Sequence, residues 1–308
     1  MESATYKAYL KLAKHFYSER IDGDVTPKKI TDALIRCADE YRPAYWRKLR
    51  NALELDQRDK GFEKSADRIK NTKNPLTVAN APVMIKRKIP QKQRRVKSVR
   101  DTDHQNIVAH FEKNDDMAVV SALKIAKMTG CRPAEMSGIE ILADSIVIKG
   151  AKKSAELERG LDRTLLFDKA ELDEIKRCVQ CIKNEYSSDF KTKSMKRIQA
   201  RLEKGVKALY PKRSARITLY SYRHQIGSNL KASGLDRVTV AYLMGHQSTK
   251  SVEVYGNRRS ASGSSLLRPE PAALEQARGV IRVNHTDKPK EKALVRTMTR
   301  TSSNDYSL

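Results

Sequence analysis

Four short segments of the chain contain arginine, lysine, histidine and tyrosine in an order that could act on a phosphodiester. They are Thr129–Glu135 (TGCRPAE), Gly150–Ser154 (GAKKS), Tyr220–His224 (YSYRH) and Leu243–Tyr255 (LMGHQSTKSVEVY). Arginines can hold the charge on phosphate oxygens through paired hydrogen bonds and stabilise that charge as it grows. A lysine can protonate a leaving oxygen, and a tyrosine phenol ionises more readily than a serine hydroxyl. Together these residue types predict phosphoryl transfer without a metal ion.

Taken singly, each segment also fits an ordinary structural role. Arg132 and Glu135 have the spacing of a surface ion pair on a helix, and Gly245–His246 could end a helix. Cys178 and Cys181 form one CxxC pair without a second pair downstream, which favours two helix cysteines over a zinc site. No acidic cluster with metal-ligand spacing lies near the four segments, so neither a metal nor a cofactor is expected.

The charge of the chain predicts a polyanionic partner. Its 62 Lys and Arg against 37 Asp and Glu leave a formal net charge of +25. Residues Lys86–Arg100 include eight basic side chains and no acidic one, and Lys191–Arg216 include ten basic side chains and one acidic. Such clusters favour nucleic acid. RNA is the weaker choice, because aromatic residues are only 6% and no RNP-type motif is present.

The absence of an apolar run of about 18 residues argues against a membrane span, and the first residues lack a signal-peptide core. We therefore expect a cytoplasmic, nucleoid-associated protein.

The length of the chain suggests about two domains. Residues 1–70 read as a small helical DNA-binding domain, with a helix starting at Thr26–Pro27 and Trp46 in its core. Residues 71–100 contain three prolines among basic residues and predict an extended linker.

A second domain is expected over 101–265. Its predicted helices are 103–113, 116–129, 168–184, 193–208, 217–232, 236–243 and 248–256, with strands at 139–142, 145–149 and 163–167. Residues 150–160 would form the loop of a hairpin. Residues 266–308 read as a tail with one helix at 271–282 and disorder over the last 20 or so residues.

The order of these residues resembles the tyrosine recombinase, or phage integrase, family. Arg132 matches the first catalytic arginine, Arg223 the second, His246 the His/Trp position, and Tyr255 the nucleophile nine residues later. Lys152 is the best match to the hairpin lysine that acts as general acid, with Lys153 as its rival. The list of site residues is completed by Tyr220, which stands where the family usually has histidine and is a poorer base near pH 7.

The resemblance implies a mainly α fold with a small antiparallel β-sheet. It also implies a C-shaped, two-domain clamp on double-stranded DNA, made of a core-binding domain and a catalytic domain. The phenol would form a 3′-phosphotyrosyl link that a 5′-hydroxyl later reseals, without metal or ATP. Dimers on one site and tetramers on two sites would assemble, the tail docking in trans, with accessory DNA-bending proteins as further partners.

Two other functions stay open at this point. A type IB topoisomerase would use the same chemistry to relax DNA without a partner duplex. A DNA-binding regulator would keep the fold without catalysis, and Tyr220 gives this reading some weight. The target site, and the choice among integration, excision, cassette exchange and dimer resolution, do not follow from the sequence, because base readout depends on a few side-chain orientations and on DNA deformability.

Overall fold

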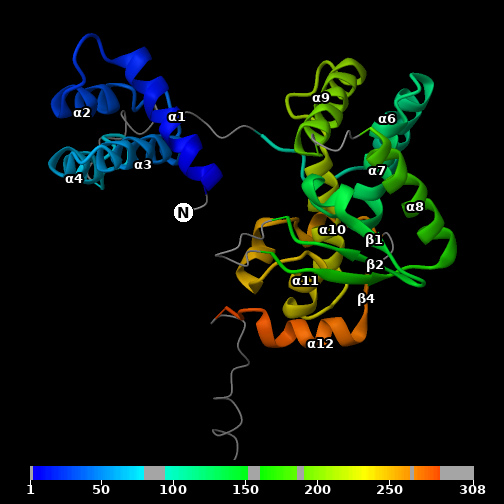
Figure 1. Cartoon of the computed structure of the whole chain (residues 1–308). Helices are drawn as coiled ribbons and strands as arrows, with labels where there is room; N and C mark the ends of the chain where they lie inside the picture. Colours follow the sequence, from blue (N-terminus) through cyan, green and yellow to red (C-terminus); the bar gives the residue numbers. More distant parts are fainter. Residues whose placement is uncertain (1–2, 80–93, 152–159, 186–190, 264–266, 285–308) are drawn as a thin grey trace, which may run out of the picture. The chain divides into compact units, whose positions relative to one another are not determined.

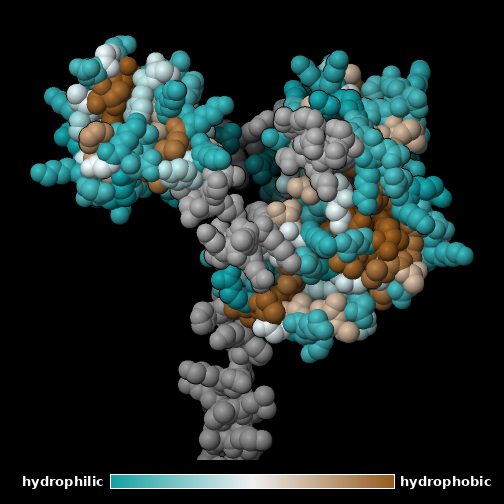
Figure 2. All heavy atoms as spheres, in the orientation of Figure 1, coloured by the Kyte–Doolittle hydropathy of each residue, from teal (hydrophilic) through white to brown (hydrophobic). Residues whose placement is uncertain are grey.

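The computed structural model describes residues 3–79, 94–151, 160–185, 191–263 and 267–284 (Figure 1). The chain divides into two compact units, Met1–Gln93 and Arg94–Leu308. Hydrophilic side chains cover most of the visible face of each unit (Figure 2). No helix in the described ranges is both long and apolar enough to cross a membrane.

The first unit is helical, as predicted. It contains α1 (Ser3–Arg20), α2 (Pro27–Arg36), α3 (Pro43–Asp59) and α4 (Glu63–Asn71). Thr26 caps α2 by accepting a hydrogen bond from the Lys29 backbone N–H, and Pro27 occupies the first turn. Trp46 is buried, and its indole N–H donates to the carbonyl oxygen of Leu34 at 2.7 Å. The prediction that Trp46 belongs to the core is thereby confirmed.

The segment between the two folded units is shorter than the linker predicted over 71–100. Leu76 is buried in the core of the first unit. Val99 is buried in the core of the second unit, and its backbone N–H donates to the side chain of Gln225. Both ends of the predicted linker therefore belong to folded units, and its middle, 80–93, lies outside the described residues.

The second unit combines helices with one antiparallel sheet. Its elements in chain order are α6 (Asp101–Lys113), α7 (Met117–Thr129), η1 (Pro133–Gly138), β1 (Ile139–Ile141), β2 (Ser145–Ile148), β3 (Arg163–Leu166), α8 (Lys169–Asn184), α9 (Lys191–Leu209), α10 (Leu219–Ala232), α11 (Arg237–Leu243), η2 (Thr249–Val254), η3 (Arg258–Ser260), β4 (Arg268–Pro269) and α12 (Pro271–Val280). The strands lie in the order β1-β2-β3-β4. The mainly helical fold with a small antiparallel sheet is thus as expected.

Two elements differ from the sequence-based expectations. The helix expected over 248–256 is a 3-10 helix, η2, which ends before an extended Tyr255. The segment after residue 265, expected as a separate tail, is part of the second unit as far as Asn284. Its strand β4 pairs with β3, and its helix α12 packs on α11. Residues 285–308 lie outside the described residues. A pairing between distant strands leaves no local sequence pattern, which is why the sequence did not indicate it.

Helices α7 and α10 form the centre of the second unit. Nine of the side chains of α7 are buried, and α10 is buried from Ser221 through Leu230. The two helices pack against each other, and α7 also contacts α8, α9 and α6. Because α10 is enclosed, its polar residues point into the protein and need partners there.

Gly205 on α9 tests how tightly this core is packed. A Cβ at Gly205 would lie 2.4 Å from the ring of the buried Phe111. We expect Gly205→Ala to destabilise the second unit by about 1–2 kcal/mol despite the better helix propensity of alanine. Urea unfolding followed by circular dichroism measures this.

Gly279→Ala on α12 is the matched control, because no described atom outside its own stretch of helix lies within 4 Å of the added Cβ. It should be neutral or stabilising by up to about 1 kcal/mol. Equal effects of the two substitutions would contradict the tight contact between α9 and Phe111.

Candidate active site

Arg223 lies at the centre of the site, fully buried on α10. Its Nη1 donates to the carbonyl oxygen of Gly130 at 2.8 Å, and its Nη2 donates to that of Met244. Nη2 also lies 3.1 Å from Nε2 of His246. Since a guanidinium can only donate, Nε2 of His246 is the acceptor and its Nδ1 carries the proton. Arg223 therefore joins the end of α7 to the turn after α11.

A second set of charges surrounds the carboxylate of Glu135. Arg132 Nη1 donates to Glu135 Oε1 at 2.5 Å, and the backbone N–H of Arg132 donates to Oε2 at 2.8 Å. Arg163 Nη2 donates to Oε2 at 3.0 Å. Arg132 Nη2 also donates to the carbonyl oxygen of Gly245 at 3.3 Å. The predicted ion pair between Arg132 and Glu135 is therefore present, but it is buried and not on the surface. Glu135 is only 2% exposed and Arg132 8%.

Burial and the neighbouring cations decide the protonation states in this site. Burial alone would raise the pKa of Glu135, but Arg163 and Arg132 outweigh it and lower that pKa to about 2. Burial, followed by repulsion from Arg223 and Arg132, lowers the pKa of His246 to about 2. Burial, followed by repulsion from Arg132 and Arg163, lowers the pKa of Arg223 to about 10, which leaves it charged at pH 7. His246 is thus a neutral imidazole between cations.

The Tyr255 ring lies beside two imidazoles and one guanidinium. Its centroid is 5.1 Å from that of His224 and 5.2 Å from that of His246, with interplanar angles of 38° and 30°. The Arg223 guanidinium carbon lies 4.8 Å from the same ring centre. The ring of Tyr255 therefore lies directly beside Arg223 and His246.

The turn after Tyr255 is fastened to α10. Gly256 has φ +68°, and a Cβ there would lie 2.3 Å from the backbone nitrogen of Ser228, so only glycine fits. The Gly256 N–H donates to Nδ1 of His224 at 3.2 Å, and the Asn257 N–H donates to the Ser228 hydroxyl at 2.9 Å. Gln225 Nε2 donates to the carbonyl oxygen of Ser260. These contacts hold the segment that follows Tyr255 against the polar face of α10 in the same chain.

The structure brings together four of the predicted site residues. These are Arg132, Arg223, His246 and Tyr255. Tyr220 is 45% exposed at the start of α10, and none of the contacts described joins it to the other four. Lys152 and Lys153 lie outside the described residues. The hairpin base that precedes them contacts the cluster, since the Ala151 N–H lies 3.4 Å from Oε1 of Glu135.

Sequence reasoning missed three contributors to this site. The sequence pattern indicates Glu135 only as a surface residue and Arg163 only as part of a strand. At His224, next to Arg223, the family resemblance favours a structural over a catalytic role, and His224 contacts both Tyr255 and Gly256. One signal could have identified Arg163: burial alternates along β3, so Arg163 shares the inward register of Leu165.

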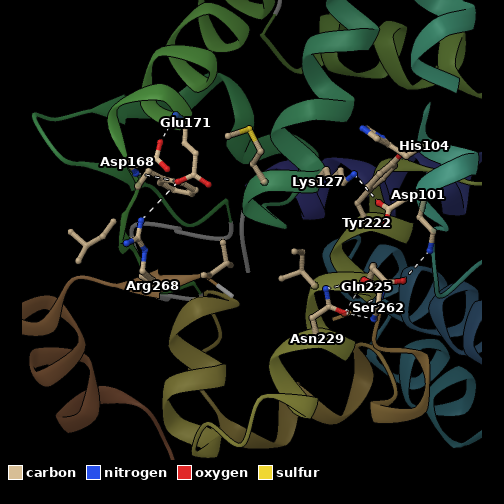
Figure 3. Close-up of a pocket in the computed structure, with 16 residues that line it drawn as sticks. Asp101, His104, Lys127, Asp168, Glu171, Tyr222, Gln225, Asn229, Ser262 and Arg268 are labelled. Carbon is tan, nitrogen blue, oxygen red and sulfur yellow. Dashed lines mark hydrogen bonds and ion pairs between the residues drawn. The ribbon is translucent and has the colours of Figure 1, made fainter. Parts of the chain in front are cut away.

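A separate pocket of about 390 Å³ lies on another side of α10 (Figure 3). Lys127 with Asp101 and His104 with Tyr222 line one side of it, and Arg268 with Glu171 line another. None of the predicted site residues that the structure describes lines this pocket. Within the described ranges, no group of three or more His, Cys, Asp or Glu side chains could hold a metal ion.

The depressed pKa of Glu135 generates a prediction about acid stability. Its folded pKa of about 2 is below the ordinary value of 4.5, so its stabilising contribution is complete above pH 4.5 and is lost as the pH falls toward 2. We expect Glu135→Gln to destabilise the second unit by about 3 kcal/mol at pH 7. The free energy of unfolding is measured with urea at several pH values from 5 down to 3. The difference between Glu135→Gln and the unmodified protein should shrink as the pH falls.

Glu203→Gln provides the control, because Glu203 forms an exposed ion pair with Arg216 and should change stability by less than about 1 kcal/mol. The single tryptophan, Trp46, lies in the first unit, so its fluorescence reports separately on that unit. A Glu135→Gln effect that is the same at every pH would rule out the charged cluster as its cause.

Comparison with known proteins bears on this arrangement. A family profile described as the Phage integrase family matches residues 97–261, more than half of the chain. No curated protein sequence matches the chain.

Among solved structures, the fold is similar to that of a lambda integrase dimer bound to a COC′ core site, with 16% identity and a TM-score of 0.53 over 86% of this chain and 75% of that one. A XerA recombinase aligns over 98% and 93% of the two chains, with 12% identity and a TM-score of 0.38. The Tn1549 transposon integrase in complex with transposon right end DNA aligns over 82% and 96%, with 12% identity and a TM-score of 0.41.

The match spans α6 through η3, and the segments that carry Arg132, Arg223, His246 and Tyr255 all lie inside it. The chain therefore belongs to the phage integrase family of tyrosine recombinases.

Proposed function

We propose that this protein is a site-specific DNA recombinase that cuts and rejoins DNA through a 3′-phosphotyrosyl intermediate on Tyr255. The observation that carries the proposal is the convergence of Arg132, Arg223, His246 and the Tyr255 ring around one buried cationic cluster. Binding DNA alone does not require a phenol at such a cluster, whereas transfer of a phosphoryl group to a protein nucleophile does.

The chemistry follows from these groups. The phenolic oxygen attacks phosphorus and releases its proton to solvent as the new bond forms, and the bond from phosphorus to the 5′-oxygen breaks. Arg132 and Arg223 stabilise the charge that accumulates on the non-bridging oxygens. The leaving 5′-oxygen takes up a proton, which we assign to Lys152, with Lys153 as the alternative. A 5′-hydroxyl from a partner duplex then loses its proton and attacks the link, the bond from phosphorus to the Tyr255 oxygen breaks, and the phenol takes up a proton as the phosphodiester is restored.

His246 takes part in this chemistry as a neutral hydrogen-bonding group. Its Nε2 accepts from Arg223, and the proton on Nδ1 is left for an acceptor. Tyr220 is exposed and stands apart from the described cluster. We assign it no role as a base.

The proposed partner is double-stranded DNA, which the two units would enclose as a C-shaped clamp. A dimer on one site and a tetramer on two sites, with accessory DNA-bending proteins, complete the proposal, and its place of action would be the nucleoid in the cytoplasm. The net charge of +25 supports strongly salt-dependent binding.

The nucleophile is tested with Tyr255→Phe. Nicked suicide duplexes of random sequence are incubated with the unmodified protein, covalent adducts are isolated under denaturing conditions, and the trapped DNA is sequenced to identify the site. We expect adducts with the unmodified protein and none with Tyr255→Phe, which should still bind the selected duplex. Adducts that persist in the variant would refute the assignment.

A plasmid relaxation assay, run beside the adduct experiment, separates the alternatives. Relaxation of an arbitrary plasmid by a monomer, without joining of two duplexes, would identify a type IB topoisomerase. Sequence-specific binding without any adduct would identify a non-catalytic regulator.

The general acid is tested by comparing Lys152→Ala with Lys153→Ala. A 5′-bridging phosphorothiolate leaves without needing a proton, so it should restore cleavage only to the variant that lacks the acid. We expect Lys152→Ala to lose roughly 10²- to 10⁴-fold on the ordinary substrate and to recover on the phosphorothiolate. The reverse pattern would transfer the role to Lys153.

A further inference from the structure

Arg163 is a fully buried arginine outside the four sequence motifs. It lies on β3, pairs with Ile148 in the ladder, and is 1% exposed. Its Nη2 donates to Oε2 of Glu135 at 3.0 Å, while Arg132 Nη1 donates to the other oxygen of the same carboxylate. Arg132 and Arg163 therefore share one negative charge.

Stability alone does not account for this placement. Nε and Nη1 of Arg163 are buried and have no hydrogen-bond partner among the described atoms. Nη1 lies 2.5 Å from where a Cβ of Gly245 would be, so the guanidinium fills the space beneath the turn that carries His246. Burying a cation whose donors are left unpaired is unfavourable for folding.

The charges of the cluster suggest what Arg163 supplies. Arg132, Arg163 and Arg223 are cations, Glu135 is an anion, and His246 is neutral, so the described cluster has a net charge of +2. A phosphodiester carries one negative charge, and attack by a phenolate produces a five-coordinate phosphorus with two. Without Arg163, Glu135 would cancel Arg132 and leave a single positive charge.

We propose that Arg163 is a positioning residue that neutralises Glu135 and thereby leaves Arg132 charged and oriented for the scissile phosphate. This inference rests on the proposed function. Arg163 acts through Glu135 and the Gly245 turn and does not touch DNA. Its effect should be larger in the transition state than in the DNA complex, because the second negative charge appears only there.

The test compares Arg163→Met with Arg163→Lys and with Arg201→Met. Arg201 is the matched control, because it pairs with Asp116 and Glu185 in the same unit and contacts none of the cluster. The single-turnover rate of adduct formation is measured on the selected suicide duplex, once with the ordinary scissile phosphate and once with an uncharged methylphosphonate there.

We expect Arg163→Met to slow cleavage of the ordinary duplex roughly 10- to 100-fold with little change in DNA affinity, and to slow cleavage of the methylphosphonate much less. Arg163→Lys, which retains the charge, should recover part of the rate. Arg201→Met should leave the ratio between the two substrates unchanged. An equal loss on both substrates, or no loss, would overturn the proposal.

A second measurement needs no catalysis. Inorganic phosphate is titrated into the free protein while the Nε–H resonances of Arg132 and Arg223 are followed by NMR. At pH 8 inorganic phosphate is a dianion, as the transition state is, so Arg163→Met should bind it about tenfold more weakly because one positive charge is lost close to the anion. Unchanged phosphate affinity would overturn the inference, whereas failure of the unmodified protein to form any adduct would overturn only the proposed function.

Discussion

Burying three guanidinium groups around one carboxylate is the constraint on which the second unit depends. Removing a cation from water is costly unless its donors find acceptors. Glu135 serves Arg132 and Arg163, and the carbonyl oxygens of Gly130 and Met244 serve Arg223. The two carbonyl acceptors come from the ends of α7 and α11, and Glu135 lies in η1. The loops after two helices must therefore meet beside α10 before the cluster can be buried at all.

The same cluster decides the chemistry of the histidines. Burial, followed by repulsion from Arg223 and Arg132, disfavours a positive charge on His246, so it stays neutral and can accept a hydrogen bond from Arg223. Burial, together with Lys97 and Arg95, also lowers the pKa of His224, whose Nδ1 accepts from the Gly256 N–H. Two neutral imidazoles can lie against the Tyr255 ring without adding charge that the arginines would repel.

Helix α10 ties the segment that carries Tyr255 to the core of the second unit. Its buried residues include Gln225, Ser228 and Asn229, which would be unfavourable inside a protein without partners. The backbone after Tyr255 supplies those partners through Asn257, Ser260 and Ser262. The hydrogen bonds that satisfy the polar face of α10 therefore also hold the segment that carries the Tyr255 phenol.

The sequence alone determined what depends on neighbours along the chain. The cap at Thr26–Pro27 was readable because it involves consecutive residues, and the spacing from Arg223 to Tyr255 was readable because it resembles that of a known family. Tertiary structure alone decided that Glu135 is buried between Arg132 and Arg163, that Tyr220 faces solvent, and that β4 joins β3. These outcomes depend on segments far apart in the sequence, and no local periodicity records which of them will meet.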